Sequence, residues 1–261
     1  MKILLNFNIS KFQNQFKNLI DNSIVVGMKA ETESEGLSWG QISNLRIFSA
    51  ELNLPFYLKI GGCEAKTDVV QSQQLNINYL IAPMIETVFA ASKFYDSTSL
   101  KGLNENLQRL ILIETKTAIS NLTEILEYSQ NWVSGINFGR TDLLRSLNLT
   151  DSSIKNFEDE RFKEILEFAI YETKRRNLIV TVGGNMNKKN IRNFLSFKSL
   201  PDKIETRRFI LSFDAVIEKP DILDLVLLVE LELIESMIAK NHFSLGRLNE
   251  YKLALNSRFL G

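Results

Sequence analysis

The sequence has 261 residues, with 31 basic and 31 acidic side chains and a formal net charge of zero. This length is enough for one large domain with a substantial core, and the balanced charge does not favour a nucleic acid or an anionic membrane as partner. The chain has one cysteine and one histidine, Cys63 and His242, which excludes an intrachain disulfide, a thiolate-rich metal site and a zinc site built on clustered histidines.

The hydropathy pattern predicts a chain that does not enter a membrane. No stretch approaches the roughly 18 uninterrupted apolar residues of a membrane span, and the opening MKILLNFNISKFQNQ becomes polar too early for an export signal. Together with the single cysteine, this indicates a cytoplasmic protein. We expect His242, which lies between two helical stretches, to be an exposed loop residue.

Short apolar runs rich in β-branched residues recur along the chain, and each predicts a strand. Segments with helical periodicity separate most of them. Strands that alternate with helices predict crossover units and a parallel sheet, and eight such units predict an α/β fold with a closed (β/α)8 TIM-type barrel. In chain order the expected strands are 1–7, 23–29, 55–60, 78–84, 109–114, 132–139, 177–184 and 204–213. The expected helices between them include 38–53, 86–96, 117–130 and 163–177.

Nothing in the composition marks a linker, so we expect residues 1–261 to form a single barrel domain with a C-terminal helical extension at 220–261. The longest polar interruption, 146–162, is expected to be a loop or short helix over one mouth of the barrel. The segment DILDLVLLVELELIESMIAKN after Pro220 predicts a helix that is apolar on more than one side. Such a helix is usually buried, either on its own barrel or against a neighbouring subunit, and we expect a homo-oligomer.

Polar side chains collect where four of these strands end. In a parallel barrel, reactive groups gather at the carboxyl ends of the strands. The residues at these ends are Lys29, Glu31, Lys59, Glu114 and Asp142.

Glu114 and Asp142 are 28 residues apart, about one crossover unit, so they should end neighbouring strands about 5 Å apart at the backbone. Two carboxylates this close repel each other unless one is protonated or a cation lies between them. Magnesium or manganese prefers oxygen ligands and often uses only one or two protein carboxylates. The alternative is that each carboxylate caps the helix that follows it.

Three segments resemble one known family. NYLIAPMIET, RLILIETKTAISNLTEIL and GINFGRTDLLRSLNL, in this order, resemble the HpcH/HpaI aldolase and citrate lyase β-subunit family. The resemblance runs from about residue 24 to 150. It implies a metal-dependent barrel of the pyruvate/phosphoenolpyruvate type, and it does not specify a substrate.

The resemblance also implies roles for individual residues. The glutamate and the aspartate that bind Mg²⁺ or a similar cation in the family fall on Glu114 and Asp142. The family's contacts to the substrate carboxylate fall on Gly139, Thr141 and the amide of Asp142. Arg140 stands where many relatives have proline, so an additional charge contact to the substrate is possible. Lys29, at the end of its strand, is a further expected substrate contact.

The sequence departs from the family pattern at two places. Lys59 matches the family's strand-end arginine, and it keeps the charge without the bidentate fork. The aldolases carry a histidine in an acidic loop, whereas KAETESEG has none. We therefore expect Glu31, or with less support Glu33 or Glu35, to transfer the proton, because burial can raise the pKa of a carboxyl toward neutrality. The alternative is that this loop is only a solvated acidic segment.

The segment KIETRRFI adds a charged group near the C-terminal part of the barrel. If it is one strand, Glu205 and Arg207 share a face and Arg208 lies on the other, so an inward ion pair or an anion contact is possible.

The sequence therefore favours a metal-dependent carbon–carbon lyase of the aldolase type, acting on a pyruvate-like 2-oxo acid through a stabilised enolate. One alternative is cleavage of an acyl-CoA thioester, as in the citrate lyase branch, although that branch usually has an arginine where this chain has Lys116. Another is a non-catalytic barrel that retains metal or ligand binding, which the missing loop histidine and Lys59 favour.

Overall fold

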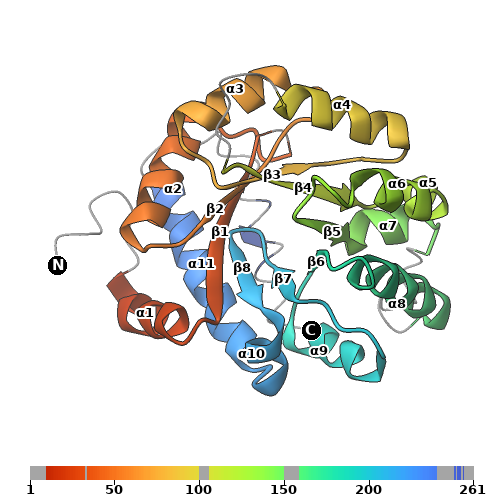
Figure 1. Cartoon of the computed structure of the whole chain (residues 1–261). Helices are drawn as coiled ribbons and strands as arrows, with labels where there is room; N and C mark the ends of the chain where they lie inside the picture. Colours follow the sequence, from red (N-terminus) through yellow and green to blue (C-terminus); the bar gives the residue numbers. More distant parts are fainter. Residues whose placement is uncertain are drawn as a thin grey trace.

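The computed structural model describes residues 10–32, 34–99, 106–149, 159–239, 250, 252–253 and 255. Within these ranges, eight strands close into a barrel in chain order, and helices surround it (Figure 1). The predicted α/β barrel is thereby confirmed. The expected strand at 1–7, His242 and the middle of the expected loop, 150–158, lie outside the described residues.

Seven strands of the barrel run parallel, and the eighth does not. β8 pairs antiparallel with both β7 and β1, which closes the ring. The strands are β1 (Val25–Glu31), β2 (Phe56–Lys59), β3 (Tyr79–Ala82), β4 (Gln108–Ile113), β5 (Gly135–Gly139), β6 (Ile179–Gly183), β7 (Lys203–Glu205) and β8 (Phe209–Ser212).

The prediction of one strand over 204–213 is wrong, because the chain reverses between β7 and β8. The Thr206 N–H donates to the Phe209 carbonyl at 2.9 Å, and the Phe209 N–H donates to Thr206 Oγ1 at 3.2 Å. These bonds close a hairpin whose two turn residues are Arg207 and Arg208. The two arginines therefore do not alternate across a strand, contrary to the expectation.

The helices follow the strands as predicted, and several begin at a polar cap. The Ser38 hydroxyl caps α2 in a capping box with Gln41, and Thr87 caps α4. The helical elements are η1 (Ser10–Phe12), α1 (Gln13–Asp21), α2 (Trp39–Glu51), α3 (Lys66–Gln74), α4 (Val88–Thr98), α5 (Lys116–Ser120), α6 (Leu122–Ser129), α7 (Arg140–Ser146), α8 (Glu160–Lys174), α9 (Lys188–Arg192), η2 (Asn193–Ser196), α10 (Phe213–Glu218) and α11 (Ile222–Ala239). None of the described helices combines the length and the hydropathy that a membrane crossing requires.

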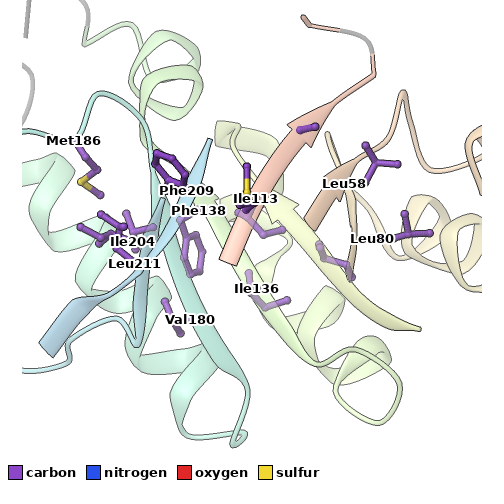
Figure 2. Close-up of a cluster of buried hydrophobic side chains, with 14 of the residues drawn as sticks. Leu58, Leu80, Ile113, Ile136, Phe138, Val180, Met186, Ile204, Phe209 and Leu211 are labelled. Atoms are coloured by element: carbon purple, nitrogen blue, oxygen red, sulfur yellow. The ribbon is translucent and has the colours of Figure 1, made fainter. Parts of the chain in front are cut away.

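The main core lies between the strands and the surrounding helices. Residues such as Leu58, Ile136, Phe138 and Val180 project from the strands into this layer (Figure 2). Because side chains alternate along a strand, their neighbours point into the barrel. A second, smaller cluster of buried apolar residues includes the inward-pointing residues Tyr57, Ile81, Leu110, Leu112 and Ile210. The barrel interior is thus apolar in one part, and its polar groups collect toward the carboxyl ends of the strands.

The C-terminal helix α11 packs on its own chain. Its residues Leu223, Val226 and Leu233 are fully buried in the main core, and the helix contacts α1 and α9. The helix was expected to be buried either on its own barrel or against a neighbouring subunit, and the structure shows it buried on its own barrel. The buried Glu230 of α11 also accepts hydrogen bonds from the Thr206 hydroxyl and the Arg208 N–H, so the helix holds the β7–β8 turn.

Candidate active site

A cavity of about 540 Å³ opens at the carboxyl ends of the strands. Its volume is within the range of roughly 300–1,000 Å³ that is typical of small-molecule sites. The structure brings seven of the eight predicted site residues to its wall. They are Lys29, Glu31, Lys59, Glu114, Gly139, Thr141 and Asp142.

Glu114 follows the last residue of β4 and is buried. Its Oε1 accepts a hydrogen bond from the Met84 N–H at 3.1 Å. Burial raises the pKa of the Glu114 carboxyl and the charge of Asp142 adds to the rise, whereas Lys59 and the Met84 N–H oppose it. A second carboxylate near the same space has this effect on Glu114, because like charges disfavour ionisation.

Gly139, at the end of β5, makes room for the Glu114 side chain. A Cβ atom at this position would lie 2.9 Å from both Cβ and Oε2 of Glu114, which is closer than real contacts allow. A glycine is therefore required where the glutamate turns into the cavity.

Asp142 lies in the first turn of α7, where a negative charge also interacts favourably with the helix. Its side chain is 54% exposed and forms a long ion pair with Arg145, with 3.6 Å between Oδ1 and Nη1. The N-cap residue of α7 is Gly139, and no side-chain hydrogen bond caps this helix. Asp142 therefore does not serve as the cap of α7.

Glu114 does not cap the following helix either. The N-cap of α5 is Thr115, whose hydroxyl accepts from the Ala118 N–H at 3.1 Å. The structure thus leaves the Glu114 carboxylate directed to the cavity.

The two carboxylates fit a hard divalent cation by their chemistry. Among the described residues, Glu114 Oε2 receives no hydrogen bond, and the exposed pair with Arg145 is the only ion pair or hydrogen bond of the Asp142 side chain. The described residues form no group of three or more His, Cys, Asp or Glu side chains that could hold a metal. A pair of carboxylates nevertheless suits Mg²⁺, which keeps several positions for water and substrate.

A network of alternating charges covers the other side of the cavity. The Lys29 ammonium lies 2.5 Å from Glu205 Oε1 and 3.2 Å from Glu31 Oε1. Lys59 Nζ lies 3.5 Å from Glu31 Oε2, and the Ser34 hydroxyl donates to the same carboxylate. Glu31 therefore sits between two lysines.

These pairs fix the charge states of the network. Burial alone would raise the pKa of the Glu31 carboxyl, but Lys29 and Lys59 outweigh it and hold that pKa well below its ordinary value. Burial likewise opposes the charge of Lys29, yet Glu205 and Glu31 hold the pKa of its ammonium well above its ordinary value. The expectation that burial raises the pKa of Glu31 is wrong, because it did not include the two cations.

Arg140 is the predicted site residue that the structure turns away from the cavity. Its side chain is buried, and Nε donates to the Gly183 carbonyl at 3.0 Å while Nη2 donates to the Gly184 carbonyl. Its guanidinium also lies 5.6 Å from the centroid of the Phe194 ring. Its observed contacts hold the loop after β6, and the expected substrate contact is corrected accordingly.

The sequence patterns predict no role for Asn137 and no definite role for Glu205. Glu205 Oε2 accepts from Asn137 Nδ2 at 3.0 Å, and a Cβ atom on Gly183 would lie 2.7 Å from Glu205 Cγ. A polar residue at an inward position of the apolar strand GINFG is the signal that points to Asn137. Glu33 lies outside the described residues, and Glu35 is buried beside the cavity in ion pairs with Arg207 and Arg208.

The HpcH/HpaI aldolase/citrate lyase family model matches residues 63–179. The match covers 117 of the 261 residues, so it is the central part of the chain that is similar to this family. All three motifs lie within the match, whereas Lys29, Glu31 and Lys59 precede it. The two departures from the family pattern thus fall outside the matched part, and the match begins at residue 63 and not near residue 24, where the sequence motifs predict the resemblance to begin.

Solved structures share the barrel at low sequence identity. An HpcH/HpaI aldolase/citrate lyase family protein from Burkholderia cenocepacia J2315 has a TM-score of 0.56 and 13% identity, covering 70% of this chain and 79% of that one. An HpcH/HpaI aldolase from Desulfitobacterium hafniense DCB-2 has a TM-score of 0.54 and 12% identity, covering 71% of this chain and 78% of that one. The citrate synthase SbnG has a TM-score of 0.55 and 10% identity, covering 74% of this chain and 91% of that one. No curated protein sequence matches the chain.

Proposed function

We propose that this protein is a divalent-metal-dependent lyase that makes or breaks a carbon–carbon bond next to a 2-oxo acid. The observation that supports this most strongly is the cavity wall, where Glu114, Asp142 and Lys59 face one space at the carboxyl ends of the strands. The family is one of aldolases and lyases, and the proposal assigns their type of chemistry to this cavity.

Glu114 and Asp142 would hold Mg²⁺ or Mn²⁺, which when bound withdraws electrons from the keto group of a pyruvate-like unit and favours its enolate. The ammonium of Lys59 stabilises the negative charge that develops on the enolate oxygen, since a fixed cation in a partly closed cavity acts strongly on developing charge. Gly139 and Thr141 also line the cavity, and their contact with the substrate carboxylate stays a prediction.

Glu31 is better suited to positioning than to accepting a proton. Its lowered pKa makes it a weak base, because lysines on both sides stabilise the carboxylate. By holding Lys59 at 3.5 Å and sharing Lys29 with Glu205, it orients the ammonium that faces the substrate. We therefore assign Glu31 a positioning role in place of the general-base role expected from the sequence.

The direct test is turnover of a panel of 2-oxo acids with aldehydes, and of acyl-CoA thioesters, in the presence of Mg²⁺ or Mn²⁺. We expect a carbon–carbon cleavage or condensation that requires the metal and is lost in Glu114→Gln. A Glu124→Gln variant alters an exposed glutamate of α6 and should keep full activity. Turnover that is unaffected by chelation and by Glu114→Gln would refute the proposal.

A second candidate is a barrel that binds metal and a 2-oxo acid without catalysis. The position of Glu31 between two lysines favours it, because the two cations lower the pKa of the expected base and make it a weak proton acceptor. Metal-dependent binding of pyruvate without turnover of any panel member would support this candidate over the lyase. A homo-oligomeric assembly and a cytoplasmic location stay predictions.

A further inference from the structure

The turn between β7 and β8 carries two adjacent arginines with different surroundings. The Arg208 side chain is 0% exposed, and its Nη1 lies 2.5 Å from Glu35 Oε2. The Arg207 side chain is 26% exposed, lines the cavity, and its Nη1 lies 3.4 Å from Glu35 Oε1. Glu35 is thus the close partner of the buried arginine and a looser partner of the arginine at the cavity.

The turn that presents Arg207 is held from two sides. On one side, Glu35 comes from the loop after β1 and pairs with both arginines. On the other side, the buried Glu230 of α11 accepts from the Thr206 hydroxyl at 2.9 Å and from the Arg208 N–H. A side chain on such a supported turn is positioned before a ligand arrives, which lowers the entropy cost of binding.

Arg207 lies across the cavity mouth from Glu114. The strands follow the ring in chain order, so β8 lies opposite β4 in a closed barrel of eight strands. Glu114 follows β4 and Arg207 precedes β8, yet both line the same cavity. A ligand held at Glu114 and Asp142 by its 2-oxo acid end therefore extends toward Arg207. With a volume of about 540 Å³, the cavity is much larger than a pyruvate unit.

We propose that Arg207 is a specificity residue that receives a second carboxylate, so that the protein prefers dicarboxylic 2-oxo acids. This inference rests on the proposed function, because it places the first carboxylate and the keto group at the metal side of the cavity. The planar guanidinium matches a carboxylate with two parallel hydrogen bonds, which a lysine at this position does not provide. Glu35 balances Arg208 at short distance, and its looser contact orients Arg207 toward the cavity.

The test compares two ligands of equal chain length, 2-oxoglutarate and 2-oxopentanoate, which differ in the second carboxylate. Their affinities are measured by calorimetry with Mg²⁺ on the full chain. We expect the intact protein to bind 2-oxoglutarate about 10- to 100-fold more tightly, the effect of one charged hydrogen-bonded contact. Arg207→Gln should remove this preference and leave the affinity for 2-oxopentanoate unchanged, and Arg207→Lys should retain part of it.

The matched control is Arg175→Gln, which removes an exposed arginine that pairs with Glu172 on α8, away from the cavity. It should keep the preference, and thermal unfolding of each variant shows whether it is folded. If both ligands bind only with metal but equally well, or if Arg207→Gln weakens both equally, the role of Arg207 is refuted and the proposed function survives. If neither ligand binds with metal, the proposed function itself fails and the inference fails with it.

Discussion

Gly139, at the end of β5, and Glu114, directly after β4, lie so close together that a Cβ atom on the glycine would stand 2.9 Å from the carboxylate Oε2. Gly139→Ala should therefore displace the carboxylate that we assign to the metal. We expect the affinity for Mn²⁺ to fall by about 10- to 100-fold, the usual effect of disturbing the support of a ligand. Calorimetric titration with Mn²⁺ measures this change.

The control for that variant is Gly62→Ala, because a Cβ atom at Gly62 meets no atom within 4 Å. It should bind Mn²⁺ as the unaltered protein does. Equal affinities of Gly139→Ala and Gly62→Ala would show that Glu114 is not part of a metal site.

Removal of Glu35 should destabilise the fold. Glu35→Ala leaves the guanidinium of Arg208 fully buried without its closest carboxylate. A buried charge that loses its partner costs about 3–5 kcal/mol. Urea unfolding should show this loss, whereas Glu160→Ala, which removes the exposed partner of Lys163, should cost less than about 1 kcal/mol. A loss as small as that of the control would contradict the assigned pairing.

The contribution of Glu31 to stability should depend on pH in one direction. The folded pKa of Glu31 lies well below its ordinary value of 4.5, because Lys29 and Lys59 outweigh the effect of burial. The stabilisation is therefore present above pH 4.5 and is lost as the pH falls toward the folded pKa. The difference in unfolding free energy between the unaltered protein and Glu31→Gln should stay constant from about pH 7 to pH 5 and shrink below that. A difference that grows as the pH falls would contradict the ion pairs of Glu31.

We expect a substitution of Arg140 to reduce the stability of the fold more than the affinity for the ligand. Arg140→Lys keeps the charge but cannot reach the carbonyls of Gly183 and Gly184 with the same fork. We expect a loss of about 1–3 kcal/mol in urea unfolding, the cost of unsatisfied buried groups, with substrate affinity much less affected. Unchanged stability together with lost affinity for a 2-oxo acid would instead support the substrate contact expected from the sequence.

The positions of the strand-end residues were predictable because they depend on short patterns. An apolar, β-branched run that ends in a carboxylate, followed by helical spacing, gives Glu114 its place at the mouth of the barrel. The spacing to Asp142 matches one crossover unit, so the meeting of the two residues at one cavity follows from the topology.

The hairpin at the end of the barrel was not predictable from the same patterns. Its two turn residues, Arg207 and Arg208, are not the glycine, asparagine or aspartate that usually mark a tight turn. What stabilises the turn instead is tertiary, namely the pairing with Glu35 and the hydrogen bonds to Glu230. The local pattern of residues 204–213 therefore predicts one strand. In the structure this segment contains the end of β7, the turn, and β8, which is the only antiparallel strand among the described barrel strands.

The charge states of the site also depend on contacts that no local pattern shows. Burial of Glu31 was expected to raise its pKa, but the lysines that reverse the shift come from its own strand and from the next one. Arg140 is adjacent to the cavity residues in sequence, yet its side chain extends to the loop after β6.

The proposed function depends on Glu114 and Asp142 sharing one divalent ion that binds a 2-oxo acid. The most direct measurement is calorimetry of pyruvate binding with and without Mn²⁺, on the unaltered protein and on Glu114→Gln and Asp142→Asn. We expect binding that requires Mn²⁺ and is abolished or greatly weakened in both variants, while Glu124→Gln binds normally. Pyruvate binding that is equally tight without Mn²⁺, or that both variants retain, would refute the shared metal site.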